Sequence, residues 1–534
     1  MSSPSAPWWR DAVIYQVYVR SFADSDGDGL GDLPGVRAHL DHLRDLGVDA
    51  LWLNPFYPSP QNDAGYDVSD YRDVEPRFGT LADADALVTE AHERGLRVIV
   101  DLVPNHTSSE HVWFRAALAA PRGSRERSRY LFRDGRGDDG SVPPNDWVSV
   151  FGGPAWSRVT EPDGRPGQWY LHLFDATQPD LDWTNSEVVE EFHDVLRFWL
   201  ERGVDGFRID VAHGLAKDQD MPDIDGRFAT SGPAEHGHPH WDQDEVHEVY
   251  RGWRGVLDRY DGDRTFVAEA WVATAERLAL YLRPDELHTA FNFPYLLAPW
   301  SAPELVRVID ETLDALREVG APATWVLSNH DVVRHATRFG GGAVGVRRAR
   351  AASALMLALP GGAYVYQGEE LGLEEVLDLP DEARQDPTFA RTHGEEKGRD
   401  GCRVPIPWSG AEAPFGFGPA GSTPWLPQPA SWGSLTVEAQ DGDPGSTLEL
   451  YRRLLRVRKA SPALGEGTLA WVETGSPEVL AFVREPGFLC VANTGAQPAA
   501  VPAQARGARV LVSSSPVEED GVVPADTTVW YATG

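Results

Sequence analysis

The chain has 534 residues, of which 42% are hydrophobic and 24% charged, a composition typical of a globular protein with one large domain and one or two smaller ones. Its 82 acidic residues against 48 basic residues give a formal net charge of −34, which argues against nucleic acid or an anionic membrane as partner, because a phosphate-binding surface needs clustered Lys and Arg. A small neutral ligand fits this charge better.

The ends and the cysteines give two further expectations. The first residues, MSSPSAPWWRDAV, lack a basic segment followed by an apolar run, and no apolar stretch is long enough to span a bilayer. Cys402 and Cys490 are too far apart in sequence to indicate a disulfide framework. We therefore expect a soluble cytoplasmic protein, either a monomer or a homodimer.

A pattern of helix, glycine and buried strand repeats along the chain. Apolar residues at helical spacing over 36–46 precede Gly47 and the strand-like run 48–54. The same order recurs over 81–103 and over 184–210. This alternation predicts an α/β fold.

Eight strands of this kind can be placed, at 12–19, 48–54, 96–103, 204–210, 265–270, 288–293, 323–328 and 362–366. Eight parallel strands alternating with helices close into a TIM barrel, and the chemistry of such a barrel lies at the carboxyl ends of its strands. Most of these strands end on polar or acidic residues, which indicates a shared active-site face.

Two segments interrupt the repeat. Residues 107–177, after the third strand, are rich in Gly, Pro, Arg and Asp and too long for a plain loop, so they predict a small excursion domain. A second excursion, over 374–443, follows the eighth strand. The catalytic barrel is then expected to comprise 1–106 and 178–461, and the alternating runs of 462–534 predict a C-terminal antiparallel β-sandwich.

Arg208 and Asp210 lie two residues apart and therefore share one face of the fourth strand. A guanidinium beside a carboxylate favours the ionised acid, and an ionised Asp at the end of a buried strand can bond to an electron-poor carbon. On this segment alone, an ordinary ion pair at the rim of the sheet is about as good an interpretation.

Four short segments carry a more specific resemblance: DLVPNH at 101–106, GFRID at 206–210, EAW at 269–271 and SNHD at 328–331. Their order and context resemble the motifs of the α-amylase family, glycoside hydrolase family 13. QPDLDW at 178–183 resembles the QPDLN motif of the oligo-1,6-glucosidase and α-glucosidase branch, with Asp182 where that branch usually has Asn. The resemblance spans most of the chain and implies a barrel, an excursion domain after strand three and a C-terminal β-domain.

The resemblance implies three catalytic carboxylates. Cleavage of a glycosidic bond with retention needs two carboxyl groups about 5 to 5.5 Å apart, one ionised and one protonated. Asp210 resembles the nucleophile and Glu269 the general acid/base, whose sequence neighbours offer little charge compensation and so favour its protonated form. Asp331 resembles the third carboxylate, which stabilises the transition state and binds sugar hydroxyls.

The same motifs imply a ring of groups around the terminal glucose, as in exo-acting members: Tyr66, Asp67, His106, Arg208, His330 and Arg403. Tyr66 is expected to be the stacking platform, and Asp67 and Arg403 to close the pocket. A closed pocket admits one terminal glucose, whereas an open cleft would make an endo-amylase. For His106 alone, a satisfied core histidine is the alternative.

DSDGDGLGD at 24–32 places acidic side chains at alternate positions and predicts an oxygen-lined cation site. The candidate ligands are Asp24, Asp26, Asp28, the carbonyl of Leu30, and Asp32. Without a bidentate Glu at the twelfth position this is no EF-hand, and it resembles the loop-type Ca²⁺ or Mg²⁺ site of the oligo-1,6-glucosidase branch. A solvated acidic turn is the alternative, and a bound metal is expected to stabilise the fold without a catalytic role.

These features predict a retaining exo-acting α-glucosidase that releases glucose from the non-reducing end of maltose, isomaltose and their oligosaccharides, with transglucosylation left open. Trehalose synthase and sucrose-converting members use the same catalytic set and stay as alternatives. A catalytically inactive transporter subunit would lack the acid pair, and a sugar-binding module would not need Glu269. Val211, directly after the nucleophile, stands where relatives that cleave isomaltose tend to carry Val and maltose-restricted relatives Thr.

Overall fold

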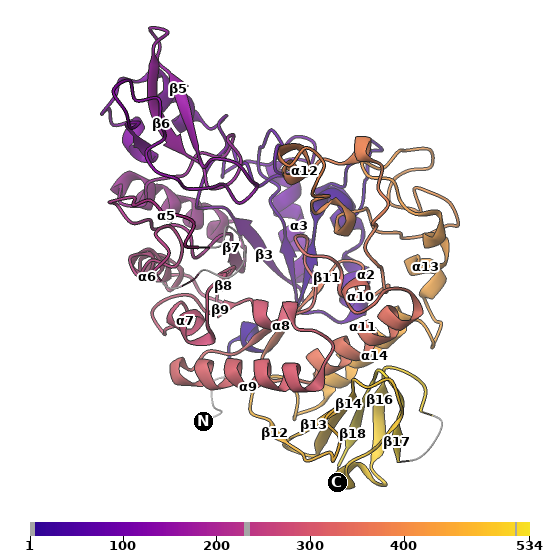
Figure 1. Cartoon of the computed structure of the whole chain (residues 1–534). Helices are drawn as coiled ribbons and strands as arrows, with labels where there is room; N and C mark the ends of the chain where they lie inside the picture. The colour runs from indigo at the N-terminus through magenta and orange to yellow at the C-terminus, as the bar shows by residue number, and fades with distance from the viewer. Residues whose placement is uncertain (1–5, 229–234, 236, 518–520, 534) are drawn as a thin grey trace.

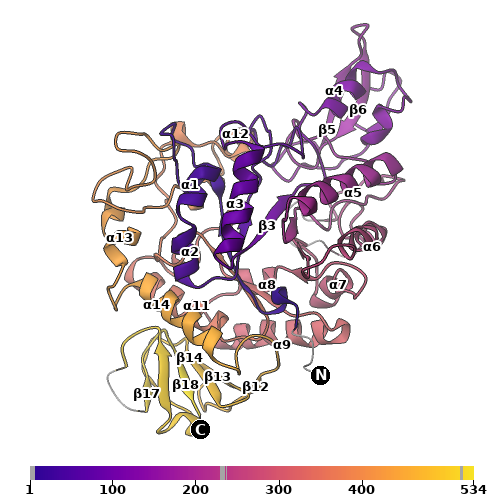
Figure 2. The same cartoon turned by 180° about the vertical axis from the view of Figure 1, so that it is seen from behind.

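The computed structural model describes residues 6–228, 235, 237–517 and 521–533. A body of helices and strands occupies the centre, with a small domain containing β5 and β6 at one end and the C-terminal sheet at the other (Figure 1). Figure 2 shows the same two sheets at opposite ends when the molecule is seen from behind. The central body therefore lies between the two smaller units.

Eight parallel strands of the described chain form one sheet, in the order β10-β11-β1-β2-β3-β7-β8-β9. They are β1 (Val13–Val17), β2 (Ala50–Leu53), β3 (Arg97–Leu102), β7 (Gly206–Ile209), β8 (Thr265–Ala268), β9 (Thr289–Ala290), β10 (Thr324–Val326) and β11 (Gly362–Tyr366). The amide of Asn292, just after β9, donates to the carbonyl of Thr324 in β10 at 3.1 Å, so the two ends of this order meet. The predicted (β/α)8 barrel is confirmed, and each strand lies within its predicted segment.

Helices surround the strands: α1 (Leu33–Ala38), α2 (Leu40–Leu46), α3 (Leu81–Glu93), α5 (Ser186–Glu201), α6 (Val246–Leu257), α7 (Ala275–Leu280), α8 (Phe293–Leu297), α9 (Ala302–Val319), α10 (His335–Arg338), α11 (Gly342–Met356) and α14 (Thr447–Ala460). The single helix predicted over 36–46 is wrong in one respect, because His39 departs from helical geometry between α1 and α2 (φ −111°, ψ 10°). Among the helices that the structure describes, none has both the length and the apolar composition needed to cross a bilayer.

Successive side chains of each strand point to opposite faces of the sheet, and this divides the core of the barrel into two layers. Trp52 of β2 packs inside the barrel with Ile14 and Ile99 of the neighbouring strands. Leu51 and Leu53 of the same strand belong to the larger core between strands and helices. This period of two also turns one side chain of β7, Arg208, toward the interior, between outward-packed Phe207 and Ile209.

The small domain lies between β3 and β7 and contains α4 (Val112–Ala119), β4 (Phe132–Arg133), β5 (Trp156–Thr160) and β6 (Pro166–Leu171). Its antiparallel sheet has the order β4-β6-β5. These elements fall within the predicted excursion domain, whose boundaries at 107 and 177 stay predictions. Its core cluster includes Trp147, Trp156 and Leu171, and also Val211 and Trp241 from the loop after β7. The core of the small domain therefore reaches the residue that follows Asp210.

After β11 the chain forms two short helices, α12 (Pro387–Arg391) and α13 (Val437–Gln440), before α14. The C-terminal unit contains β12 (Ala470–Trp471), β13 (Val479–Arg484), β14 (Phe488–Asn493), β15 (Ala499–Ala500), β16 (Arg509–Ser513), β17 (Val522–Val523) and β18 (Thr527–Ala532). They pair as an antiparallel sheet of order β12-β13-β14-β18-β16 and a second, two-stranded sheet of β15 and β17.

The C-terminal sheet is buried on both faces. Phe482 and Trp530 pack against the barrel, where the indole of Trp530 donates to the carbonyl of Ala354 in α11 at 2.9 Å. Leu489 and Val523 belong to a separate cluster between the two sheets. The predicted antiparallel β-sandwich is thus confirmed, while its boundary at 462 stays a prediction.

A buried carboxylate that the sequence patterns did not single out joins three barrel strands at their amino ends. Asp205, fully buried before β7, accepts hydrogen bonds from the amide of Val98 (2.9 Å), Arg97 (2.9 Å), Arg264 (2.8 Å) and the ring of His92 (2.7 Å). Burial opposes its ionisation, but these donors together hold the pKa of Asp205 below its usual range. One side chain thus links β3, β7 and the segment before β8.

We predict that Asp205→Ala lowers the free energy of unfolding by about 3 kcal/mol, because the two guanidinium groups and the Val98 amide lose their shared acceptor. Denaturant unfolding measures the change. Asp194→Ala is the matched control, since Asp194 is an exposed partner of Arg197, and its loss should cost less than about 0.5 kcal/mol. Equal losses in the two variants would contradict a special role for Asp205.

Candidate active site

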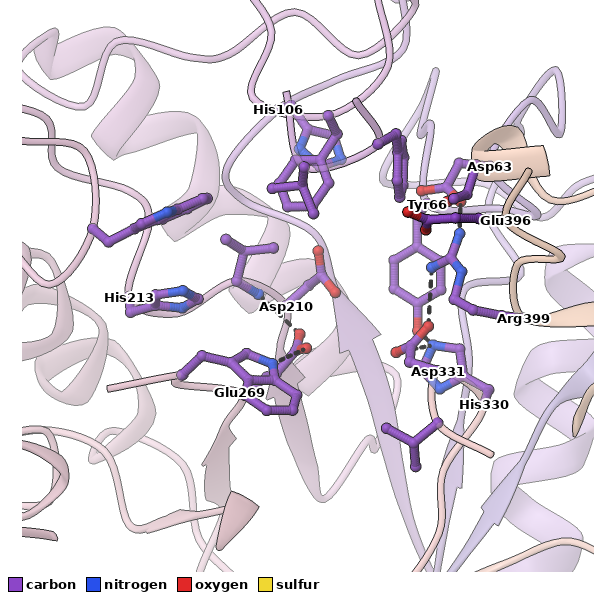
Figure 3. Close-up of a pocket in the computed structure, with 18 residues that line it drawn as sticks. Asp63, Tyr66, His106, Asp210, His213, Glu269, His330, Asp331, Glu396 and Arg399 are labelled. Carbon is purple, nitrogen blue, oxygen red and sulfur yellow. Dashed lines mark hydrogen bonds and ion pairs between the residues drawn. The ribbon is translucent and has the colours of Figure 1, made fainter. Parts of the chain in front are cut away.

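A pocket of about 370 Å³ opens at the carboxyl ends of the barrel strands, where the sequence predicts the chemistry (Figure 3). Loops after six strands and the small domain contribute its lining: Asp63, Tyr66, His106, Val150, Phe151, Phe174, Asp210, Val211, His213, Trp241, Glu269, Trp271, His330, Asp331, Val332, Thr388, Glu396 and Arg399. The three predicted catalytic carboxylates are therefore brought together, with Asp210 and Glu269 on one side and Asp331 on the other.

Arg208 joins three carboxyl groups beneath this pocket. Its Nη1 donates to Asp101 (2.9 Å) and to Asp210 (2.6 Å), and its Nη2 donates to Glu269 (2.5 Å). The register of the sheet explains these contacts, because Asp101 of β3 pairs directly with Arg208 of β7. Arg208 also lies 5.1 Å from the ring centre of Trp52, inside the barrel.

The acids outnumber their cation at this point. Burial raises the pKa of Asp210 well above its usual range, with Glu269 and Asp101 adding to the effect and Arg208 opposing it. Burial likewise raises the pKa of Asp101 to about 7. The expectation that Arg208 holds Asp210 ionised by itself is therefore too simple, since one guanidinium is shared by three acids. The three acids therefore titrate as one coupled group.

Glu269 has more partners than its sequence neighbours indicate. Besides Arg208, the amide of Val211 (3.1 Å) and the indole of Trp271 (3.2 Å) donate to its carboxyl group. The expectation of little charge compensation is wrong, because the compensating guanidinium comes from the adjacent strand. Asp210 and Glu269 therefore accept from the two terminal nitrogens of one guanidinium, which holds both carboxyl groups at the same point of the pocket.

Val211 has an unusual backbone. Its φ of 47° lies in the left-handed region, which is costly for a β-branched residue, by about 1 to 3 kcal/mol. Its amide faces Glu269 while its side chain lines the pocket and packs in the core of the small domain. The strained residue therefore couples Glu269 to that core.

Neutral donors surround the inner end of the pocket. Tyr66 stacks on His330 with ring centres 5.3 Å apart and planes 5° apart, and its hydroxyl contacts the His330 ring at 2.7 Å and donates to Asp101 at 3.0 Å. Burial lowers the pKa of His330 well below its usual range and that of His106 to about 4, so both rings are neutral. Neutral rings suit the hydroxyls of an uncharged sugar. Both histidines and Tyr66 lie where they were predicted.

The inner end of the pocket, which forms its floor, consists of a network of ion pairs. Arg399 donates to Asp63 (2.8 Å), to Asp331 (3.0 Å) and to Asp386 (2.5 Å). Burial opposes ionisation of Asp331, but the neighbouring His330 and the two guanidinium groups of Arg399 and Arg403 hold its pKa below the usual range. Asp331 is therefore a carboxylate that faces the ring-binding end.

Two predicted pocket residues lie behind this floor. Asp67 is fully buried and accepts from the hydroxyl of Ser59 (2.7 Å) and the amides of Asn62 (2.9 Å) and Asp63 (3.2 Å), so it shapes the loop that presents Asp63. The prediction that Asp67 itself closes the pocket is corrected by this placement.

Arg403 is likewise outside the lining. It donates to the carbonyl of His330 (2.8 Å) and to Asp331 (3.0 Å), and so positions the third carboxylate. Asp63 and Arg399 close the pocket instead. Sequence reasoning missed both, although they lie three residues before Tyr66 and four before Arg403.

The QPDLDW segment, residues 178–183, supports Asp63 and His106 from outside the pocket. The amide of Gln178 contacts Asp63 and the ring of His106, each at 3.1 Å, and Asp180 pairs with buried Lys217 at 2.9 Å. Asp182, the residue that departs from the branch pattern, accepts from Thr184 and does not line the pocket. The departure therefore lies outside the pocket lining.

The acidic loop before α1 lies outside the pocket lining. Carboxylate oxygens of Asp24, Asp26 and Asp28 lie within 4.8 Å of one another, and such oxygens are the ligands that Ca²⁺ and Mg²⁺ prefer. Asp32 is outside this group, because its oxygens accept from the amide of Gly35 (2.6 Å), where it caps α1, and from Ser25 (2.7 Å). That corrects one predicted ligand, and the Leu30 carbonyl stays a prediction.

Comparisons with known proteins agree with this geometry. A family model for the alpha amylase catalytic domain matches residues 16–467. A probable alpha-glucosidase of Rhizobium meliloti (strain 1021) is 41% identical over 506 residues, covering 91% of this chain and 88% of the relative. A trehalose-6-phosphate hydrolase of Bacillus subtilis (strain 168) is 37% identical over 521 residues, covering 91% of this chain and 88% of the relative.

Two further similarities cover the chain as fully. An oligo-1,6-glucosidase of Parageobacillus thermoglucosidasius is 35% identical over 522 residues, with 90% of this chain and 88% of the relative covered. The crystal structure of an alpha-glucosyl transfer enzyme, XgtA, superimposes with a TM-score of 0.90 at 38% identity, covering 99% of this chain and 100% of that one.

Proposed function

The chain belongs to the α-amylase family, glycoside hydrolase family 13, and is a glycoside hydrolase of the α-glucosidase type; from its closed pocket we propose that it removes one glucose at a time from the non-reducing end of short α-glucosides. The observation that carries this proposal is the Arg399 network. Arg399, Asp63 and Asp331 cross the inner end of the pocket, so a sugar ring bound there has no room for a further residue beyond it. An endo-amylase would need an open cleft at this point.

The first chemical step uses the pair that shares Arg208. The Asp210 carboxylate attacks the anomeric carbon while Glu269 donates its proton to the leaving oxygen, which departs as an alcohol. The product of this step is a glucosyl ester on Asp210. Asp331 faces the same ring and stabilises the positive charge that develops on it in the transition state.

The second step reverses the roles. Glu269, now a carboxylate, takes a proton from water as the water oxygen bonds to the anomeric carbon, and the bond to Asp210 breaks. The amide of Val211 and the indole of Trp271 fix the orientation of Glu269 through both steps. Two displacements at one carbon retain the α configuration.

Phosphorylated substrates fit the pocket poorly, although trehalose-6-phosphate hydrolases are among the relatives. A phosphate needs unpaired cations or several backbone amides. Of the described residues that line the pocket, Arg399 is the one permanent cation, and it already pairs with Asp63, Asp331 and Asp386. Glu396 adds a negative charge to the lining. The electrostatics therefore favour neutral α-glucosides.

We predict that maltose and isomaltose are hydrolysed with kcat/KM values within about tenfold of each other, because a single apolar group such as Val211 changes specificity by only about 1 to 3 kcal/mol. Trehalose-6-phosphate should be hydrolysed at least about a hundredfold more slowly, since Arg399, the one permanent cation of the described lining, is already paired and leaves no cation for the phosphate. Chromatography of the products from maltose, isomaltose, sucrose, trehalose and trehalose-6-phosphate measures both ratios.

The products from the same five substrates also distinguish hydrolysis from the reactions of the alternative enzymes. Rearranged disaccharides from maltose or sucrose, with little free glucose, would identify a trehalose synthase or a sucrose-converting enzyme and contradict hydrolysis as the main reaction. Long internal fragments from starch would contradict exo action.

Asp210→Asn should abolish turnover of every substrate, because no glucosyl ester can form. Glu269→Gln should spare the first step for aryl α-glucosides with good leaving groups while slowing maltose by about 10²- to 10⁴-fold, the contribution of acid–base catalysis. Steady-state rates on 4-nitrophenyl α-glucoside and maltose make the comparison. Equal losses on both substrates in Glu269→Gln would remove its assignment as the acid/base.

We also propose that the loop of Asp24, Asp26 and Asp28 holds a structural Ca²⁺ or Mg²⁺ ion. Three carboxylates converge there, and the amides of Gly27 (2.7 Å) and Gly29 (2.9 Å) donate to Asp24, which leaves the group with excess negative charge. When bound, the cation would neutralise that charge and tie together the loop that precedes α1. The loop contributes no residue to the pocket lining, so the ion has no part in the reaction.

Asp28→Ala should lower the melting temperature in the presence of Ca²⁺ or Mg²⁺ and abolish most of the stabilisation that added metal gives the parent protein, about 2.7 kcal/mol at a hundred times Kd. Calorimetry with and without chelator measures this response. Asp45→Ala, an exposed acid of α2, is the matched control and should keep it. Immediate loss of activity on chelation, with the fold intact, would contradict a purely structural ion.

We further propose a cytoplasmic location. Cys402 and Cys490 are both buried and free, in different parts of the molecule, which suits a reducing compartment. A monomeric or homodimeric state stays a prediction.

A further inference from the structure

A second cavity, of about 400 Å³, lies at the end of the barrel opposite the active site, and the hydrolysis of α-glucosides gives it no role. The amino ends of β1, β2 and β3 and the last turn of α14 form its lining. Figure 2 shows α14 on the side of the barrel that faces the C-terminal sheet, away from the small domain. We call it the basal cavity; its charged lining residues are Asp11, Asp49, Arg97, Arg458 and Lys459.

One of these residues is a buried guanidinium without an anionic partner. Arg458 is 6% exposed and donates to the carbonyls of Leu357 (2.6 Å), Gly361 (2.5 Å) and Asp11 (3.0 Å). These bonds use its two terminal nitrogens, and among the described residues no group accepts from its Nε and no carboxylate lies within ion-pair distance. Carbonyl oxygens satisfy donors but carry only partial negative charge, so the charge of Arg458 is not neutralised.

A second buried guanidinium lies behind the first. Arg484 of β13 is 1% exposed and donates to the carbonyls of Ala358 (3.0 Å), Gly465 (2.9 Å) and Glu466 (3.0 Å). Burial lowers the pKa of Arg458, and it lowers the pKa of Arg484 to about 10, with the charge of Arg458 adding to the effect. Such lowering is expected where a buried cation lacks an anion.

The remaining charges of the basal cavity do not remove this excess. Lys459 pairs with Asp49 at 2.8 Å, and Arg97 pairs with Asp205, which it shares with Arg264. Three cationic side chains and two carboxylates line the cavity, so its formal charge is +1 although the chain carries −34. The basal cavity is therefore a local site of positive charge in an acidic protein.

The size and chemistry of the basal cavity indicate the class of ligand. Small-molecule sites are commonly about 300 to 1,000 Å³, and the basal cavity falls in that range. A guanidinium and an ammonium group are the side chains that most often bind phosphate oxygens. A phosphate group, either free or carried by a sugar, would supply the anion that Arg458 lacks.

We propose that the basal cavity binds the phosphate group of a small ligand, with the Nε of Arg458 and the ammonium of Lys459 as its donors. The inference does not rest on the proposed function, because the basal cavity and the active-site pocket share no lining residue. A bound phosphate would link α14 to the amino ends of the barrel strands and stabilise the folded state by mass action.

The test is isothermal titration calorimetry of the whole enzyme with inorganic phosphate and with glucose 6-phosphate, at an ionic strength held constant with chloride. We expect at least one of the two ligands to bind with one molecule per chain and to raise the melting temperature. The ligand that binds more tightly shows whether the phosphate is free or carried by a sugar.

Two variants with opposite expected effects locate the site. Lys459→Glu should weaken the binding by at least about tenfold, because it replaces a donor by a like charge. Asp11→Asn should strengthen it by about threefold, because it removes a carboxylate from the lining and leaves the carbonyl that Arg458 uses. The second variant decides the matter should the first fail to fold.

Lys397→Glu is the matched control. Lys397 is also about half exposed and also pairs with an aspartate at 2.8 Å, but it lies outside the basal cavity, so this variant should bind like the parent. Absence of binding by both ligands would overturn the inference. Equal weakening in Lys459→Glu and Lys397→Glu, or binding that neither Lys459→Glu nor Asp11→Asn changes, would overturn it as well, and each of these results would leave the α-glucosidase assignment intact.

Discussion

The active site depends on one guanidinium that is shared by three carboxyl groups. Arg208 contacts Asp101, Asp210 and Glu269 in a buried setting, where charges interact strongly and each acid disfavours ionisation of the next. Burial raises the pKa of Asp210 and that of Asp101, and the shared guanidinium opposes this rise. The sheet register that pairs Asp101 with Arg208 is what makes this arrangement possible.

The small domain has a chemical as well as a covering role. Its core takes in Val211, whose left-handed backbone turns an amide toward Glu269, and Trp241, whose ring borders the far side of the acid pair. A change in the packing of that core would therefore reach both Glu269 and the part of the pocket that Trp241 lines.

The sequence was sufficient where local pattern determines the structure. Short apolar runs, three of them preceded by a helical pattern and a glycine, located every barrel strand, and the family motifs at the strand ends located Asp210, Glu269 and Asp331. It failed where a loop decides which of two neighbouring side chains faces the pocket. Asp63 and Asp67 are four residues apart, as are Arg399 and Arg403, and in each case the predicted residue supports the one that lines the pocket. The contact between Arg208 and Glu269 joins two adjacent strands, and Trp241 reaches the pocket from a long loop without a periodic pattern, so neither has a local signal.

The central claim is that Asp210, held by Arg208, bonds covalently to the sugar. The most direct measurement is mass spectrometry of a peptic digest after incubation with 5-fluoro-α-glucosyl fluoride, which forms the glucosyl ester faster than water removes it. The account predicts one added fluoroglucosyl group, carried by a peptide that contains residues 206–214 and located on Asp210. A label on Asp101 or Asp331, or no label while fluoride is released by the same preparation, would contradict it.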